Sequence, residues 1–231
     1  MSLVHWHDSL PSTMSEAARL ASLGAPHGSV VAARQQTAGM GRHGRQWLSP
    51  PGDGLYCTFI LRPAQPLGLT LGLGVAVREA LAPHAGAELD LRWPNDVLWR
   101  ERKLCGILAR MEHGALLAGI GINLNQTEFP AGLRTPAVSL RQIRDQTFRA
   151  EDVLDLIAPS VEEVSALPLG EQLRLFVRFS SYAVGRRVRI ENEGTALVGV
   201  TDGLDEAGFL MIRKEDGSRE AVYAGSVRPL D

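Results

Sequence analysis

The sequence predicts an α+β protein built from two domains that meet near residue 184. Up to that position, helical segments with an apolar side alternate with short strand-like runs, and glycine-rich or polar stretches interrupt them. After Gly185 short apolar runs are separated by turn signals about every ten residues, a pattern typical of a small antiparallel barrel or sandwich. The chain has 231 residues, enough for one large core and a small satellite. We therefore expect domains at residues 1–183 and 184–231.

The first predicted element is a helix near residues 13–23. Thr13 and Glu16 have the spacing of a capping box, alanines and leucines supply an apolar side, and Gly24 is placed to end the helix. Residues 29–34 are short and β-branched, which predicts a strand. Residues 35–54 form a long polar stretch rich in glycine and proline. Loops of that length inside a compact domain are uncommon and usually functional.

Further elements follow along the chain in the same way. Residues 67–81 are apolar on nearly all sides, which predicts a buried helix despite their glycines. In the second domain, polar turns are expected at residues 192–194, 202–208 and 214–218. The remaining predicted strands cover residues 55–61, 89–93, 104–111 and 116–123, and the remaining predicted helices lie at residues 151–167 and within 169–182.

Composition and charge exclude several classes of protein. Apolar residues make up 45% of the chain and charged residues 22%, as in ordinary soluble globular proteins. The formal net charge of −2 gives no overall positive field for nucleic acid or anionic lipid. No segment is long and apolar enough to span a membrane, and the N-terminus does not have the pattern of a signal peptide. Cys57 and Cys105 stand far apart, so we expect buried, reduced thiols in a cytoplasmic protein. The dispersed histidines predict no metal site made by the protein.

The glycine-rich stretch Gly39-Met40-Gly41-Arg42-His43-Gly44 formally matches a dinucleotide-binding fingerprint. That interpretation fails because the residues that follow contain two prolines and cannot open a helix. Without it, the stretch is a glycine loop that carries Arg42 and Arg45. Backbone N–H groups and guanidinium groups of such a loop can bind a phosphate or a carboxylate, although a solvated surface loop is the alternative.

Two further motifs allow a functional and a structural interpretation. Residues 91–98 (LRWPNDVL) precede a strand that begins near Lys103, so Asn95 and Asp96 suit a tight turn. This is either part of a site or a β-hairpin with a solvated polar tip. In residues 118–125 (AGIGINLN), glycines at alternate strand positions weaken a strand unless something packs closely against its backbone. A flat ligand and a neighbouring helix both meet that requirement.

Together these motifs resemble the signature blocks of biotin–protein ligases. QTAGMGRHGRQW, RWPNDVL followed by KLCGIL, and GIGINLN occur in the order that this family has, and Ser12-Thr13 after Asp8-Ser9 resembles its N-terminal D-S-T segment. The resemblance implies a mixed β-sheet flanked by helices, of the class II synthetase-like type, followed by a small SH3-like barrel. It also implies an enzyme that converts biotin and ATP into biotinyl-5′-AMP, with Mg²⁺ on the phosphates. The biotinyl group is then transferred to one lysine of a biotin carboxyl carrier domain, such as that of acetyl-CoA carboxylase.

The resemblance carries roles over to individual residues. Lys103, Arg42 and Asp96 are the implied catalytic residues: Lys103 where the biotin carboxylate meets the α-phosphate, Arg42 on the adenylate phosphate, and Asp96 as a group that could help to deprotonate the acceptor lysine. The implied biotin site consists of Ser12, Thr13, Gln36, Gly39, Met40, Gly41, Arg42, Lys103, Gly119 and Gly121. The implied nucleotide site consists of Arg42, Arg45, Trp47, Asn95, Lys103 and Asn123, with Asp96 on the same side.

Three positions depart from the usual family pattern. Met40 and His43 replace arginines of the loop, and Arg92 replaces the lysine before W-P-N-D. Met40 cannot supply a guanidinium group, so only its backbone is expected to contact a ligand. Arg92 keeps the positive charge but cannot act as an amine that loses its proton.

Other functions of related kind are weaker interpretations of the same residues. A lipoate–protein ligase shares the fold and the chemistry, but the W-P-N-D block and the loop favour biotin. A biotin-responsive repressor would need a DNA-binding domain, whereas the ligase pattern begins near residue 5, so we expect no specific DNA partner. A protein that only binds biotin would need neither Arg42 nor Lys103. The oligomeric state stays open, a homodimer included.

Overall fold

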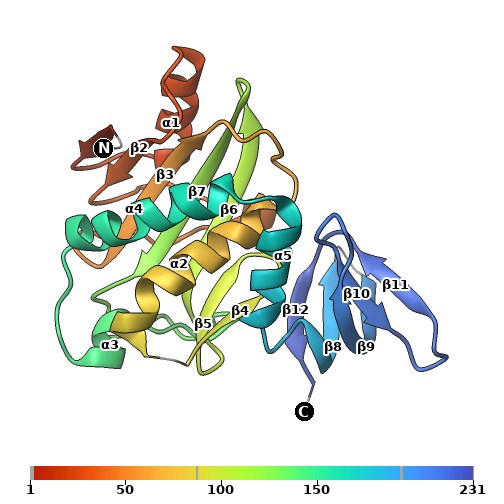
Figure 1. Ribbon diagram of the computed structural model, residues 1–231. Coiled ribbons are helices and arrows are strands. Elements are labelled where there is room, and N and C mark those ends of the chain that lie inside the picture. The colour runs from red at the N-terminus through yellow and green to blue at the C-terminus, as the bar shows by residue number, and fades with distance from the viewer. Residues whose placement is uncertain (1–2, 87, 193–194, 231) are drawn as a thin grey trace.

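Two β-sheets form the framework of the computed structural model, which describes residues 3–86, 88–192 and 195–230 (Figure 1). The strands of the larger sheet are β1 (Val4–His7), β2 (Ser29–Ala33), β3 (Gly54–Leu61), β4 (Leu89–Arg92), β5 (Asp96–Trp99), β6 (Arg102–Glu112) and β7 (Ala115–Asn123). Their order across the sheet is β1-β2-β3-β7-β6-β5-β4. The pair β1 and β2 is parallel, and the other pairs are antiparallel. The mixed sheet that the sequence implied is therefore confirmed.

Helices α2 (Leu69–Ala85) and α4 (Ala150–Ala166) pack on one face of this sheet, which is the near face in Figure 1. Helix α5 (Leu169–Arg178) packs against α2 and against the C-terminal unit, and the short helix α3 (Leu140–Arg144) lies against α2. The helix α2 packs on the sheet with one side and against α4 and α5 with the other. Because it is enclosed in this way, its sequence is apolar on nearly all sides, as predicted.

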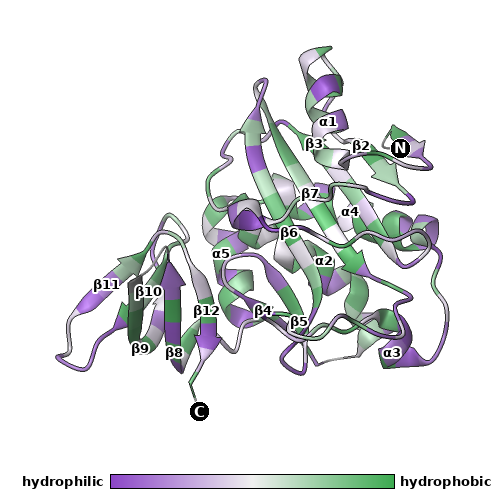
Figure 2. Cartoon of the chain, turned by 180° about the vertical axis from the view of Figure 1, so that it is seen from behind, coloured by the Kyte–Doolittle hydropathy of each residue, from purple (hydrophilic) through white to green (hydrophobic). Residues whose placement is uncertain are grey.

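Helix α1 (Thr13–Ser22) packs on β2, β3 and β7 on the opposite face of the sheet. Ser12 caps this helix, since its hydroxyl accepts a hydrogen bond from the backbone N–H of Met14. In Figure 2, which views the molecule from behind, loop segments cross this face, and α2 and α4 lie beyond the sheet. Alternate residues of β7 therefore have different surroundings: Ile120 and Ile122 belong to the core that includes α2, whereas Gly119 faces α1 and Gly121 faces the loop that carries Trp47.

The C-terminal unit is a five-stranded antiparallel sheet. Its strands are β8 (Val184–Asn192), β9 (Thr195–Leu204), β10 (Leu210–Arg213), β11 (Arg219–Val222) and β12 (Ser226–Pro229), in the order β11-β10-β9-β8-β12. This agrees with the small antiparallel unit that the sequence predicted. The indole Nε1 of Trp93 donates a hydrogen bond to the carbonyl of Gly208, 3.0 Å away, and so ties this unit to the turn between β4 and β5.

Several details of the sequence prediction were wrong or incomplete. Strands β1 and β5 and helix α3 were not predicted, and Ser12 rather than Thr13 caps the first helix. The tight turn expected at Asn95 and Asp96 lies at residues 93–95, so that Asp96 opens β5. The turn predicted at residues 192–194 falls largely outside the described residues.

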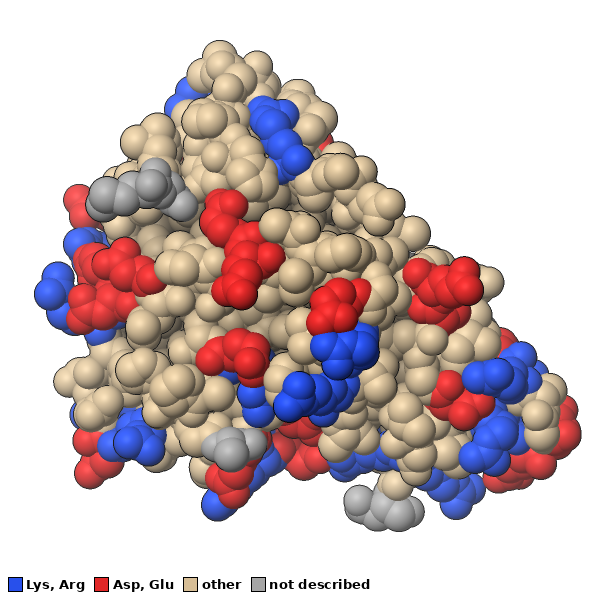
Figure 3. All heavy atoms as spheres, viewed as in Figure 1, with Lys and Arg blue, Asp and Glu red and all other residues tan. Residues whose placement is uncertain are grey.

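Charged side chains of both signs are interspersed over the face that carries α2 and α4 (Figure 3). Among the described residues, no helix has the length and hydropathy needed to cross a membrane.

The contact between α2 and α5 gives a test of the core packing. A Cβ atom added at Gly72 of α2 would lie 2.1 Å from Oε1 of Gln172, a buried residue whose Nε2 donates to the carbonyl of Leu167. Alanine gains about 1 kcal/mol of helix propensity over glycine, whereas overpacking a core costs about 1–3 kcal/mol. We therefore expect Gly72→Ala to lower the free energy of unfolding, measured by chemical denaturation.

Gly170 of α5 supplies the matched control, because nothing lies within 4 Å of a Cβ added there. Gly170→Ala should raise the stability by about 0.5–1 kcal/mol. If both variants were stabilised, the close packing of Gln172 on α2 would be incorrect.

Candidate active site

A cavity of about 830 Å³ lies on the face of the large sheet that carries α1. Strands β3, β6 and β7 form its floor, and the glycine loop at residues 35–50 crosses it. Residues 92–96, residues 126–137 and the start of β12 form its walls. The three motifs that the sequence singled out therefore meet at one cavity.

One end of the cavity is a network of hydroxyl and amide groups. Oε1 of Gln36 accepts hydrogen bonds from the backbone N–H and the hydroxyl of Thr13, at 2.8 and 3.1 Å. The Thr13 hydroxyl also lies 2.9 Å from that of Thr58, and Nε2 of Gln36 donates to the hydroxyl of Ser49. Ser12, Thr13 and Gln36 were predicted here, whereas Thr58 and Ser49 were not. They come from the strand β3 and from the end of the loop, which carry no signature for such a role.

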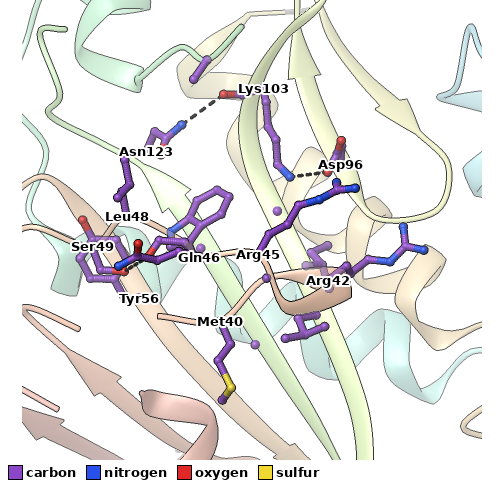
Figure 4. Close-up of a pocket in the computed structure, with 18 of the residues that line it drawn as sticks. Met40, Arg42, Arg45, Gln46, Leu48, Ser49, Tyr56, Asp96, Lys103 and Asn123 are labelled. Carbon is purple, nitrogen blue, oxygen red and sulfur yellow. Dashed lines mark hydrogen bonds and ion pairs between the residues drawn. The ribbon is translucent and has the colours of Figure 1, made fainter. Parts of the chain in front are cut away.

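The middle of the glycine loop, residues 39–47, forms a narrow hairpin. The backbone N–H of Gly41 donates to the carbonyl of Arg45 (2.7 Å), and that of Trp47 donates to the carbonyl of Gly39 (2.9 Å). His43 and Gly44 at its tip have φ of 55° and 68°, the left-handed region that the turn requires. Figure 4 shows that Met40 extends away from Lys103 and Asp96.

Close packing on the floor explains the glycines of β6 and β7. A Cβ atom at Gly121 would lie 2.5 Å from the indole of Trp47, and one at Gly106 would lie 2.9 Å from the same ring. At Gly119 the corresponding neighbour is the Met14 methyl group of α1, also at 2.9 Å. Of the two explanations that the sequence left open, the neighbouring helix is found at Gly119. The neighbour of Gly121 is the Trp47 ring, which was not predicted, and a flat ligand on this floor stays a prediction.

A cluster of three charged groups occupies the middle of the cavity wall. Nζ of Lys103 lies 2.6 Å from Oδ1 of Asp96 (Figure 4). A guanidinium nitrogen of Arg92 lies 2.6 Å from Oδ2 of Asp96. The Arg92 group also donates to the hydroxyl of Thr135, at 2.8 Å. Burial raises the pKa of the Asp96 carboxyl, but Lys103 and Arg92 together outweigh it and hold that pKa below its usual value. Asp96 is therefore an anion at neutral pH.

The two loop arginines stand on the same side of the cavity (Figure 4). The guanidinium group of Arg42 donates to Oδ1 of Asn95 and to the carbonyl of Gly225, at 3.1 and 3.2 Å. Burial lowers the pKa of Arg42, an effect that Asp96 opposes. Burial and the positive charges of Arg134 and Arg228 lower the pKa of Arg45. These arginines therefore concentrate positive charge at the mouth of the cavity.

The carboxamide of Asn123 links the floor to the wall formed by residues 126–137, which we call the outer wall. Its Nδ2 donates to the carbonyls of Lys103 and Val138, at 3.2 and 3.1 Å. Its Oδ1 lies 3.4 Å from Nε2 of Gln126, a buried residue of the outer wall. Asn123 thereby fixes the position of the backbone from which the Lys103 side chain extends.

Sequence analysis missed two walls of the cavity. Residues 126–137 supply Gln126, Phe129, Leu133 and Arg134, and β12 supplies Arg228, whose guanidinium group donates to the carbonyl of Arg134 at 2.6 Å. The only signal for the first wall is its position, a polar stretch directly after the glycine-bearing strand. Nothing local marks the second wall, which reaches the cavity through the packing of the C-terminal unit.

The structure brings nearly all predicted site residues to this cavity. The predicted residues that line it are Ser12, Thr13, Gln36, Met40, Gly41, Arg42, Arg45, Trp47, Asn95, Asp96, Lys103, Gly119, Gly121 and Asn123. Gly39 is the exception. It is buried under the loop, where an added Cβ would lie 2.4 Å from the carbonyl oxygen of Trp47, and so it shapes the hairpin without lining the cavity.

The thiols of Cys57 and Cys105 are buried and unpaired, as expected. Burial raises the pKa of both thiols, so neither is a nucleophile at neutral pH. Within the described ranges, no group of three histidine, cysteine, aspartate or glutamate side chains is arranged to hold a metal ion.

Comparison with known protein families gives two matches to this chain. Residues 6–126 match the biotin/lipoate A/B protein ligase family, and residues 183–228 match the biotin protein ligase C-terminal domain. The biotin–[acetyl-CoA-carboxylase] ligase of Mycobacterium tuberculosis is 35% identical over 91% of this chain and 82% of its own length. The bifunctional ligase/repressor BirA of Bacillus subtilis is 33% identical over 96% of this chain and 72% of its own length.

A solved structure has the same fold over the whole chain. It is the biotin protein ligase of Aquifex aeolicus in complex with biotin and ATP, which superposes with a TM-score of 0.86 at 31% identity and covers 100% of both chains.

The buried charge cluster predicts how stability depends on pH. Because folding lowers the pKa of Asp96, its contribution is complete at pH values well above the ordinary carboxyl pKa of 3.8 and is lost as the pH falls through the lowered value. We expect Asp96→Asn to unfold more easily than the wild type at pH 7. The difference should shrink below about pH 4. Denaturant titrations from pH 7 to pH 3 measure the free energy of unfolding of the wild type and of Asp96→Asn. A difference between the two that widened on acidification would contradict the lowered pKa.

Proposed function

This chain belongs to the biotin/lipoate A/B protein ligase family and carries the biotin protein ligase C-terminal domain, and from this premise we propose how its cavity acts. In the first step the cavity joins biotin to ATP and releases pyrophosphate, leaving biotinyl-5′-AMP. In the second step the biotinyl group passes to a lysine of a carrier domain. The observation that carries this proposal is the convergence of Lys103, Arg42 and the glycine floor, from three distant sequence motifs, on one cavity.

The distribution of polar groups suggests the direction in which biotin lies. The hydroxyl and amide network of Thr13, Gln36 and Thr58 offers donors and acceptors to the polar head of biotin. The cations of Lys103 and Arg42 lie on the wall around the charge cluster, where the carboxylate would meet the α-phosphate. Biotin would then span the floor between these two groups. Since the Trp47 indole covers Gly121 there, it has to make room or pack against the ligand.

Charge is the main obstacle to the first step. A carboxylate oxygen must attack the α-phosphorus of a polyanion, so the cavity has to neutralise negative charge more strongly in the transition state than before it. Lys103 and Arg42 supply that charge from fixed positions. We propose that Asp96 acts by positioning Lys103 rather than as a base, because its lowered pKa and its two ion pairs make it a weak proton acceptor.

The Mg²⁺ ion fits this cavity as a companion of the nucleotide. Asp53, Asp96 and Glu128 line the cavity, but they do not form a cluster that could enclose a metal ion. The phosphate oxygens of ATP would therefore supply most ligands, as they commonly do for Mg²⁺. Bound in this way, the ion would neutralise charge on the phosphates.

The second step forms an amide. The neutral acceptor amine attacks the anhydride carbonyl, the new C–N bond forms, and the C–O bond to AMP breaks with its electron pair leaving on the phosphate. The proton from the nitrogen passes to solvent. A biotin carboxyl carrier domain, such as that of acetyl-CoA carboxylase, is the partner that we propose. The two buried free thiols suit a reducing compartment, so we also propose a cytoplasmic location.

Incubation with ATP, labelled biotin and a biotin carboxyl carrier domain tests this function. Label should appear on the carrier and not on a lipoyl domain offered in parallel. Transfer of lipoate instead of biotin would assign the cavity to the other branch of the family, and the absence of both reactions would refute the proposal.

The variant Lys103→Ala should lose adenylation while the protein stays folded. Removing a preorganised donor of this kind typically costs roughly 10²–10³ in rate. Release of pyrophosphate from biotin and ATP measures the loss. Lys214→Ala is the matched control, because that exposed lysine pairs with Glu220 in the C-terminal sheet. Activity of Lys103→Ala within a few-fold of the control would assign the charge to Arg42 or Arg92.

The glycine loop should become more protected as ligands fill the cavity. Without ligand, the hairpin is held by backbone hydrogen bonds between residues that are close in the sequence. Once the adenylate is present, Arg42 and Arg45 also have an anion to bind. We expect trypsin to cleave after these arginines fastest without ligand, more slowly with biotin, and slowest with biotin and ATP.

In Arg42→Ala, cleavage after Arg45 should lose mainly the last increment of protection. The reactive adenylate should also escape sooner from this variant, since the loop excludes water from it. Equal cleavage in all three states would mean that the hairpin does not respond to the ligand.

A further inference from the structure

A second, smaller hollow of about 220 Å³ adjoins the active-site cavity, and we call it the side groove. Leu67–Leu71 at the start of α2 form one wall, and residues 207–209 with Tyr223 of the C-terminal unit form the other. Residues 93–95 and 107–109 form its floor. In Figure 1 the start of α2 lies on the side of the large sheet that faces the C-terminal unit, which agrees with this arrangement.

The side groove shares a wall with the active-site cavity. Arg42, Trp93, Pro94, Asn95, Ile107 and Leu108 line both. Arg42 stands at their junction, hydrogen-bonded on one side to Asn95 and on the other to Gly225 of the C-terminal unit. A chain that followed the side groove inward would therefore arrive beside the residue that we assign to the adenylate phosphate.

Apolar surface dominates the side groove and remains exposed at its rim. Leu71, Ile107 and Leu108 contribute to its walls and floor, and the Phe209 ring packs edge-on against the Tyr223 ring. Tyr223 is 71% exposed and Leu67 is 54% exposed. Large apolar side chains exposed together beside a functional cavity are typical of a surface that a partner covers.

We propose that the side groove receives the acceptor segment of the carrier protein, with the four methylenes of its target lysine lying in the hollow and its flanking apolar residues on Tyr223 and Leu67. This inference rests on the function proposed above. The second substrate of that reaction is a protein, so some surface next to the cavity must be covered during transfer. The side groove is an apolar surface that adjoins the cavity at Arg42.

The charge at the junction suits this occupant. Arg42 would repel an ammonium group that passed it but would not repel a neutral amine. The anhydride can be attacked only by the neutral amine. The side groove therefore matches a lysine in both respects, with apolar walls for its stem and a positive charge that favours the deprotonated end.

The test compares two reactions in variants of the full chain. Tyr223→Ala and Leu67→Glu remove or reverse the apolar rim, and Leu23→Glu is the control, since Leu23 is 71% exposed at the end of α1, away from the side groove. Adenylate formation is followed by the burst of pyrophosphate from biotin and ATP without carrier. Transfer is followed at increasing concentrations of a biotin carboxyl carrier domain, and also with hydroxylamine, a small nucleophile that needs no docking surface.

We expect both rim variants to form adenylate and to transfer to hydroxylamine as the wild type does, while the KM for the carrier rises roughly tenfold, the effect of losing one strong contact of an interface. The control should leave all three values unchanged. An unchanged carrier KM in the rim variants, or an equal rise in Leu23→Glu, would overturn the proposal. So would an unchanged carrier KM with altered sedimentation, which would assign the side groove to self-association. If the wild type formed no adenylate, the proposed function would fail together with this inference.

Discussion

One buried carboxylate determines where the positive charges of this site stand. Asp96 opens β5 with little exposure and receives Arg92 on one oxygen and Lys103 on the other. Without Asp96 these two cations would repel each other in a partly desolvated wall, and no negative charge would hold them there. Arg92 in turn donates a hydrogen bond to the hydroxyl of Thr135 and so fixes the outer wall relative to Asp96. The floor, the outer wall and the Lys103 amine are thus arranged around a single negative charge.

The glycines of the floor illustrate a second constraint, that of space. Glycine at positions 119 and 121 of β7, and at position 106 of β6, leaves room for Met14 and for the Trp47 indole directly on the backbone of the sheet. An ordinary side chain at position 121 would displace the ring that stands over the floor. Weak strand formers are tolerated here because the neighbouring strands β3 and β6 pair with β7 along its whole length.

Much of this architecture could be predicted from the sequence because its signals are local. The apolar run of α2, the β-branched run of β2 and the turn-rich C-terminal unit all depend on neighbouring residues, and the three motifs lie within short segments. Strands β1 and β5 have only four residues each, and Asp96, which opens β5, was assigned to the preceding turn. The predicted contact of Gly39 with biotin stays a prediction, and the place of Gly39 inside the hairpin depends on the fold of the whole loop. The approach of residues 126–137 and of Arg228 is set by packing between segments far apart in the chain.

The hydrogen bond from Arg42 to the carbonyl of Gly225 has a consequence for recombination between relatives. Residues 1–183 and 184–231 look like exchangeable modules, because the break between them coincides with a change of sequence pattern. However, Arg42 in the loop of the first part donates a hydrogen bond to the backbone of the second part, and Arg228 of the second part donates one to the backbone carbonyl of Arg134 in the first. A chimera that joined the first part of this chain to the last part of a relative would need a turn of matching shape before its final strand. The two parts are therefore coupled through backbone geometry, and Gly225 is part of that requirement, because a Cβ atom there would lie 2.8 Å from the Ile190 side chain.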